Sequence, residues 1–127
     1  MTHDIDAQTS MANAIQYAQF KKSQGIVGTY FVQTKYIKDF NDEVFLNDQG
    51  SNDMAALHRL GMELASHTVA HSEVFSYFPL GTGTERYPEY QPYVKTRTTT
   101  ANGSVFGELR VSKYLIEKLS GGANVMS

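Results

Sequence analysis

The feature that most constrains this fold is a helix, glycine, strand order that occurs twice along the chain. In the first copy, apolar residues recur at helical spacing over residues 10–24, with Ser10 as a possible N-cap and Gly25 suited to the C-terminal side. Residues 26–32 follow, and their β-branched and aromatic side chains predict a short buried strand.

The second copy lies over residues 51–66. Residues 51–53, Ser-Asn-Asp, offer N-caps for a helix that Gly61 ends, and residues 62–66 predict another strand. Helices that alternate with strands favour an α/β fold with parallel strands, whose functional groups gather at the carboxyl ends of the strands. Residues 67–72 lie at such an end.

The remaining segments are less regular. Residues 33–50 carry scattered apolar anchors without a clear period, whereas residues 105–119 have one apolar face and predict a helix. Residues 73–104 are rich in Gly, Pro, Thr and Tyr and predict a long loop, whose aromatic rings either face a ligand or pack the loop onto the domain. Residues 123–127 resemble the start of a further strand.

Composition excludes several classes of protein. The chain has 127 residues, a formal net charge of −2 and no cysteine, so it offers neither a basic surface for nucleic acid nor a thiolate for zinc binding or catalysis. No stretch approaches the ~20 apolar residues of a membrane span. We therefore expect no nucleic-acid partner and no membrane segment, and any metal site must use His, Asp or Glu. Nothing in the sequence indicates the oligomeric state.

Two motifs have spacings that are typical of metal ligands. Asp4 and Asp6 are separated by one residue, and His67 and His71 are four residues apart. On a helical turn, two such histidines share a face and can bind one cation, and a carboxylate would supply a third ligand. Three protein ligands with an open position are typical of a catalytic zinc site. Each motif alone also fits a solvated turn or structural histidines, and only their combination favours a metal site.

Further polar residues have ordinary structural explanations. His3 lies beside the first aspartate with little indication of direct chemistry, and His58 shares a helix face with core residues. Glu108 opens a helix, where its charge favours the helix dipole. Arg86 and the tyrosines around it are candidates for substrate contact, but no pattern gives them a role.

In order and context, these segments resemble the polysaccharide deacetylases of carbohydrate esterase family four, whose catalytic unit is the NodB homology domain. Residues 2–6, Thr-His-Asp-Ile-Asp, resemble the family's Thr-Phe-Asp-Asp-Gly motif in a variant with separated aspartates. Residues 25–32 are similar to the strand Gly-Ile-x-Ala-Thr-Phe-Phe-Val, residues 67–71 to the motif His-Ser/Thr-x-x-His, and residues 108–119 to the helix that follows.

The resemblance implies an α/β fold of the NodB type, an incomplete (β/α) barrel with its C-terminal strands and helices missing. It implies Asp4 as the general base and Thr68 as a support of the histidine segment. It also implies a divalent metal, with zinc the expected ion, held by Asp6, His67 and His71. Because the two aspartates are separated, Asp4 remains an alternative ligand.

The implied reaction removes acetyl groups from N-acetylated sugars of a polysaccharide or oligosaccharide by metal-assisted attack of water. The family's later motifs supply an oxyanion donor and a general acid, and residues 1–127 do not contain them. We therefore expect a partial catalytic domain that is inactive alone. The family suggests the cell envelope or secretion for the full-length protein. The alternative is a non-catalytic carbohydrate-binding or interaction module, and a third reading is hydrolysis of another amide or an O-acetyl ester.

Overall fold

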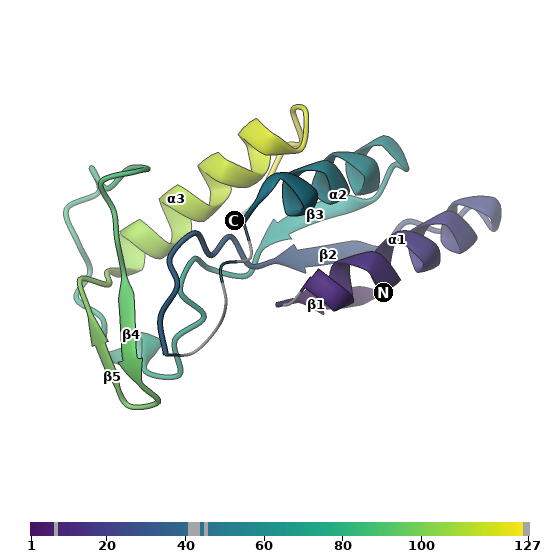
Figure 1. Cartoon of the computed structure of the whole chain (residues 1–127). Coiled ribbons are helices and arrows are strands. Elements are labelled where there is room, and N and C mark those ends of the chain that lie inside the picture. Colours follow the sequence, from purple (N-terminus) through teal and green to yellow (C-terminus); the bar gives the residue numbers. More distant parts are fainter. Residues whose placement is uncertain (7, 41–43, 45, 126–127) are drawn as a thin grey trace.

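A computed structural model describes residues 1–6, 8–40, 44 and 46–125. Its fold is mixed α/β, as the alternating pattern predicts (Figure 1). The elements follow the order β1 (Thr2–Ile5), α1 (Gln8–Ser23), β2 (Thr29–Val32), α2 (Asp48–Arg59), β3 (Glu63–Ser66), a 3-10 turn (Phe75–Tyr77), β4 (Tyr93–Thr96), β5 (Thr99–Ala101) and α3 (Val105–Leu119).

The central sheet has three parallel strands in the order β1, β2, β3. Ile5 pairs with Val32, and Val32 pairs with Ser66, so the carboxyl ends of all three strands meet at one edge. This confirms the parallel α/β arrangement. Among the described residues the sheet is open, and no barrel is formed.

The core lies between this sheet and its helices. Figure 1 shows the helices gathered on one side of the sheet. Alternation along the strands directs every second side chain to that side, and α1 and α2 bury their apolar faces against it. The buried side chains of this cluster include Ile5, Met11, Ala18, Tyr30, Val32, Met54, Leu57, Leu64 and Ile116.

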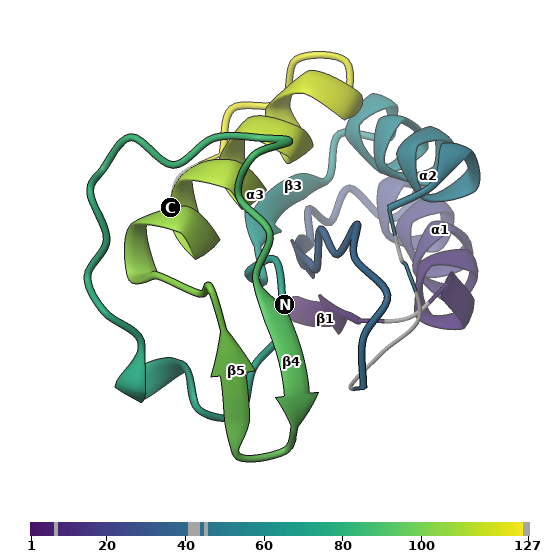
Figure 2. The same ribbon diagram turned by 60° about the vertical axis from the view of Figure 1, so that its left-hand side comes forward.

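A second buried cluster joins the segment 73–104 to α3. Figure 2 shows this segment passing the N-terminal end of α3, with the β4–β5 hairpin in front. Tyr90 is only 6% exposed and packs with Val69, Val111 and Leu115. Its ring lies against Gly107, where a Cβ atom would overlap it. The segment is thus packed onto the domain at Tyr90, one of the two outcomes that the sequence left open.

The structure corrects several predicted boundaries. Ser10 lies inside α1 and is not its N-cap. The second helix begins earlier than predicted, because the Asn47 side chain accepts a hydrogen bond from the amide of Gly50 at 2.8 Å and caps it there. The strand predicted over 26–32 is shortened to β2: Ile26 donates its amide to the carbonyl of Lys21 and so belongs to the turn that closes α1.

Two predictions for irregular segments also change. The predicted loop 73–104 contains a 3-10 turn and the antiparallel β4–β5 hairpin, which Asp39 holds from outside by accepting the amide of Val94 at 3.0 Å. Residues 123–125 form no strand in the structure, and residues 126–127 lie outside the described part. None of the described helices is long and apolar enough to cross a membrane.

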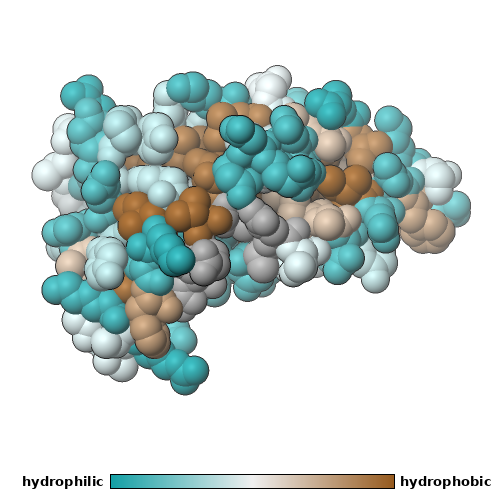
Figure 3. All heavy atoms as spheres, in the orientation of Figure 1, coloured by the Kyte–Doolittle hydropathy of each residue, from teal (hydrophilic) through white to brown (hydrophobic). Residues whose placement is uncertain are grey.

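The visible surface is mixed in polarity. On the face drawn in Figure 3, apolar side chains form separate small patches among hydrophilic ones. The exposed large apolar side chains are correspondingly scattered over different elements, such as Phe20 in α1, Tyr77 in the 3-10 turn and Tyr114 in α3. Scattered single residues of this kind are ordinary for a protein surface.

Gly107 gives a test of the packing between Tyr90 and α3. Alanine in place of a helical glycine ordinarily stabilises a protein by ~0.5–1 kcal/mol. Because a Cβ at this position overlaps the Tyr90 ring, we expect Gly107→Ala to lower the free energy of unfolding by about 1–3 kcal/mol in urea titrations. In a Tyr90→Ala background the same change should be neutral or stabilising; equal losses in both backgrounds would contradict this packing.

Candidate functional site

The candidate site lies at the carboxyl edge of the sheet. The amide of Gln33 donates to the carbonyl of Ile5 and the amide of His67 donates to the carbonyl of Val32, each at 2.9 Å. These bonds continue the parallel pairing one residue past the strands, so Asp6 and His67 begin the segments that leave the two outer strands at the same edge. Since neighbouring strands are about 4.8 Å apart, the two backbones are separated by roughly 10 Å.

Residues 67–71, the histidine turn, follow β3 directly. Thr68 and His71 have positive φ values of 64° and 50°, so this segment is an irregular turn and the helical turn expected from the spacing is wrong. The two imidazoles nevertheless lie close together, with ring centroids 4.9 Å apart and planes inclined by 48°. Two imidazoles bound to one tetrahedral zinc at ~2.0–2.1 Å would have centroids roughly 5 Å apart, so the separation of the two rings matches that of a shared metal ion.

The carboxylates predicted to complete the site are not grouped with this pair. Asp4 lies within β1 and Asp6 directly after it, and both are exposed. Within the described part of the chain, no three His, Asp or Glu side chains are close enough together to hold a metal ion. The structure therefore brings together two of the four predicted site residues, His67 and His71.

A small pocket of about 240 Å³ lies over the histidine turn. His67 and His71 line it together with Phe75 and Glu73. Sequence analysis gave Glu73 no role, yet it lines the same pocket as His67 and His71.

Side-chain oxygens hold the backbone of the histidine turn. Thr68 donates its amide to Ser66 Oγ at 3.2 Å, and His71 donates its amide to Thr68 Oγ1 at 3.2 Å. Val69 and Ala70 both donate to Glu108 Oε2, at 2.6 and 2.9 Å. All amides from 68 to 71 thus have a side-chain acceptor, which compensates for their loss of ladder partners beyond β3.

Glu108 has a structural role other than the helix-dipole one that the sequence analysis gave it. Its side chain is fully buried, and its other oxygen accepts the hydroxyl proton of Tyr90 at 3.0 Å. Burial raises the pKa of the Glu108 carboxyl, and the amides of Ala70 and Val69 oppose that shift. The signal was present: Glu108 lies four residues before Ser112 and seven before Leu115, on the apolar stripe of its helix.

The segment after β2 supports the turn from the other side. Thr34 donates its amide to the carbonyl of Thr68 at 3.1 Å. The next residue, Lys35, is buried and forms an ion pair of 2.5 Å with Asp39, which also accepts the amide of Val94. The histidine turn is therefore tied to β2, to α3 and, through Asp39, to the hairpin.

No protein-family model, curated protein or solved structure gave a significant match to this chain.

His3 lies away from this site. Its ring stacks on Tyr30 with centroids 5.0 Å apart and forms a hydrogen bond with the Lys21 ammonium group. Burial, followed by the charge of Lys21, lowers the pKa of His3. Because Tyr30 belongs to the core beneath the helices, these contacts favour a structural role for His3, in line with the sequence reading.

The role of Glu108 can be tested through stability. Glu108→Ala leaves the buried amides of Val69 and Ala70 without an acceptor, and we expect it to lower the free energy of unfolding by about 2–5 kcal/mol. Glu108→Gln keeps one acceptor oxygen and should lose clearly less. Urea denaturation of both variants measures the difference, and equal losses would show that the amide bonds do not matter.

Proposed function

We propose that this chain carries the metal-binding half of a polysaccharide deacetylase site, on an incomplete barrel of the NodB type. The observation that carries the proposal is the pair His67 and His71, whose rings lie close together after the carboxyl end of β3 at a separation that suits one tetrahedral ion. The order of the sequence motifs supports the same assignment. In this proposal, the full protein hydrolyses acetamide groups on N-acetylated sugars of a polysaccharide or oligosaccharide.

His67 and His71 would hold the divalent ion, with zinc the expected metal and Asp6 as the third ligand. A bound zinc ion supplies Lewis acidity, which polarises a carbonyl and makes water a better nucleophile. Asp4 acts as general base and takes the proton of the attacking water, or exchanges roles with Asp6. Glu108 and Thr68 keep the imidazoles in place through the backbone of the turn.

A non-catalytic carbohydrate-binding module is the second candidate. The observation that favours it is the exposure of tyrosines on the segment 73–104: Tyr77 is 85% exposed, Tyr93 42% and Tyr87 40%. Rings with this much exposed surface are available to stack on sugars. This candidate needs no metal, so metal binding separates the two proposals.

Metal binding by the histidines is the first test. We expect the chain to bind one zinc ion in calorimetric titration, and His67→Ala and His71→Ala each to weaken binding by at least about a hundredfold, since even residues that only support ligands cost ~10–100-fold. The matched control is His58→Ala, which removes a histidine of α2 and should bind zinc as the unaltered chain does. Unchanged binding in the variant that lacks both His67 and His71 would exclude the proposed site.

The carboxylate ligand is identified by parallel variants in the same titration. We expect Asp6→Asn to weaken zinc binding at least tenfold and Asp4→Asn to leave it nearly unchanged, because a general base need not contact the ion. The opposite result would exchange the two roles. If only Glu73→Gln weakens zinc binding, the carboxylate ligand is Glu73, in the pocket over the histidine turn.

A further inference from the structure

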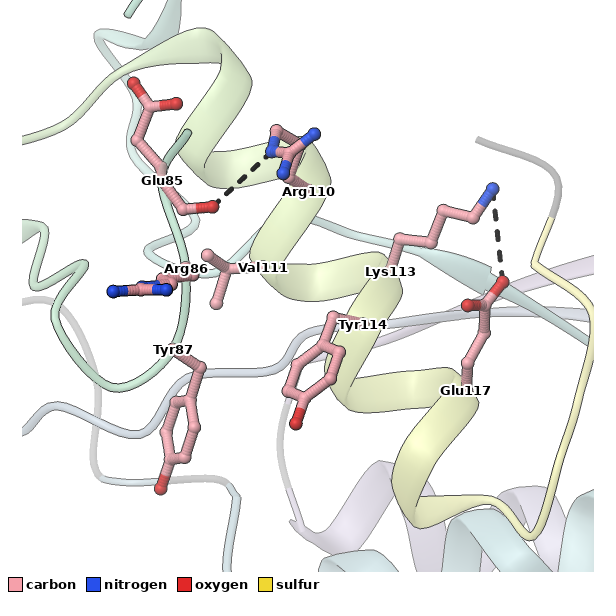
Figure 4. Close-up of a pocket in the computed structure, with 8 residues that line it drawn as sticks. All are labelled: Glu85, Arg86, Tyr87, Arg110, Val111, Lys113, Tyr114 and Glu117. Atoms are coloured by element: carbon pink, nitrogen blue, oxygen red, sulfur yellow. Dashed lines mark hydrogen bonds and ion pairs between the residues drawn. The ribbon is translucent and has the colours of Figure 1, made fainter. Parts of the chain in front are cut away.

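A larger pocket lies on α3, apart from the residues of the histidine turn. It has a volume of about 520 Å³, within the ~300–1,000 Å³ of small-molecule sites. One wall is the outer face of α3, with Arg110, Tyr114 and Glu117, and the other is the segment 85–87. Figure 4 shows these side chains around the opening.

The two walls are held at a defined separation. Tyr90 packs the segment against α3 through its contact with Gly107. Ser104, the N-cap of α3, donates its hydroxyl to the Glu85 carboxylate at 3.1 Å. Arg110 Nε also donates to the carbonyl of Glu85, at 3.4 Å. These contacts form the pocket without any ligand.

Two tyrosine rings border the opening. Tyr87 is 40% exposed and is held edge-on by Tyr36, with centroids 5.0 Å apart and planes at 89°. Tyr114 is 46% exposed, and Figure 4 shows its ring and that of Tyr87 pointing the same way from the two walls. Each ring offers an apolar face with a polar hydroxyl tip, which suits a ligand that is itself an apolar ring edged with polar groups.

Arg110 is the charged group of the lining that could bind an anion, because Arg86 lies 3.8 Å from Glu89. The Glu85 carboxylate points away from the pocket in Figure 4 and accepts the amides of Thr82 and Gly83, and the Thr82 amide lowers the pKa of Glu85. Glu117 lies 3.9 Å from Lys113. Among the described residues, no carboxylate pairs with Arg110.

Lys118 places a further positive charge beside the Tyr114 ring. Its ammonium group donates to the Tyr114 hydroxyl at 3.2 Å and lies 5.5 Å from the centroid of that ring. The ring that borders the pocket on the helix side is therefore accompanied by a second cation besides Arg110.

We propose that this pocket binds an acidic saccharide, with a sugar ring against Tyr87 and Tyr114 and its carboxylate on Arg110. A guanidinium group offers paired N–H donors that match a carboxylate, and Glu117 provides acceptors for sugar hydroxyls. The site goes beyond the proposed deacetylase function, because it uses none of the predicted metal ligands. It also gives a role to Arg86 and its neighbouring tyrosines, which line or flank the pocket.

Calorimetric titration in the presence of EDTA tests the proposal. The probe is a hexasaccharide of alternating glucuronate and N-acetylglucosamine, and the neutral comparison is a hexasaccharide of N-acetylglucosamine. We expect the acidic probe to bind at least about tenfold more tightly than the neutral one, because a hydrogen bond to a charged group is worth about that factor. Equal affinity for both probes, or no binding of the acidic one, would overturn the proposal.

Variants locate the binding. Arg110→Gln and Tyr114→Ala should each weaken binding of the acidic probe at least about tenfold. Their matched controls are Arg97→Gln, in the turn of the hairpin, and Tyr17→Ala, which removes an exposed ring of α1 outside this pocket; both should bind as the unaltered chain does. The variant lacking His67 and His71 should also bind normally, so failure of the metal site and failure of this pocket are distinguishable. Unchanged binding in both pocket variants, or loss of binding in the histidine variant, would place the saccharide elsewhere.

Discussion

The carboxylate of Glu108 is the group on which the arrangement of the histidine turn depends. A buried carboxylate without partners would cost several kcal/mol, and here each oxygen has at least one donor: the amides of Val69 and Ala70 on one side and the Tyr90 hydroxyl on the other. The same contacts satisfy amides that have lost their strand partners. The Glu108 side chain thus compensates for the strand hydrogen bonds that these amides lack in the irregular turn after β3.

This carboxylate joins parts of the chain that are distant in sequence. Glu108 belongs to α3, the turn follows β3, and Tyr90 lies in the segment 73–104, so these elements meet at a single buried group. The segment after β2 is connected to the same group, because the Tyr36 hydroxyl donates to the carbonyl of Tyr90. Burial raises the pKa values of both tyrosines, which keeps them as hydroxyl donors. The backbone that carries the two imidazoles is thus held in place before any ligand arrives, as a metal site requires.

Local patterns predicted the elements that depend on local interactions. The helix α3 was predicted with its observed bounds because its apolar stripe lies between regular helix signals, and β3 differs from its prediction by one residue. The start of α2 was missed because several adjacent residues can cap a helix, and only the structure shows Asn47 doing so. The β4–β5 hairpin lacks a clear alternation and is held by Asp39, a contact between distant segments that no local pattern reveals.

The sequence likewise predicted only part of the candidate site. Spacing brought His67 and His71 to notice, but it suggested a helical turn, whereas positive φ values at Thr68 and His71 and the acceptors Ser66 and Glu108 create the observed one. Glu108 lies in the first turn of α3, where a carboxylate favours the helix dipole. That explanation was accepted, and the position of Glu108 on the buried face of the helix was overlooked. The place of Glu73 in the lining of the histidine pocket likewise depends on how the chain leaves the turn.

Hydrogen exchange at the amides of Val69 and Ala70 tests the central claim, that the Glu108 carboxylate holds the histidine turn, most directly. In Glu108→Ala, we predict that these amides exchange roughly ten- to hundredfold faster relative to the amide of Val32 in the central strand, because each loses a hydrogen bond to a carboxylate. If Val69 and Ala70 keep the same protection relative to Val32 in the variant, the turn is held by something other than Glu108.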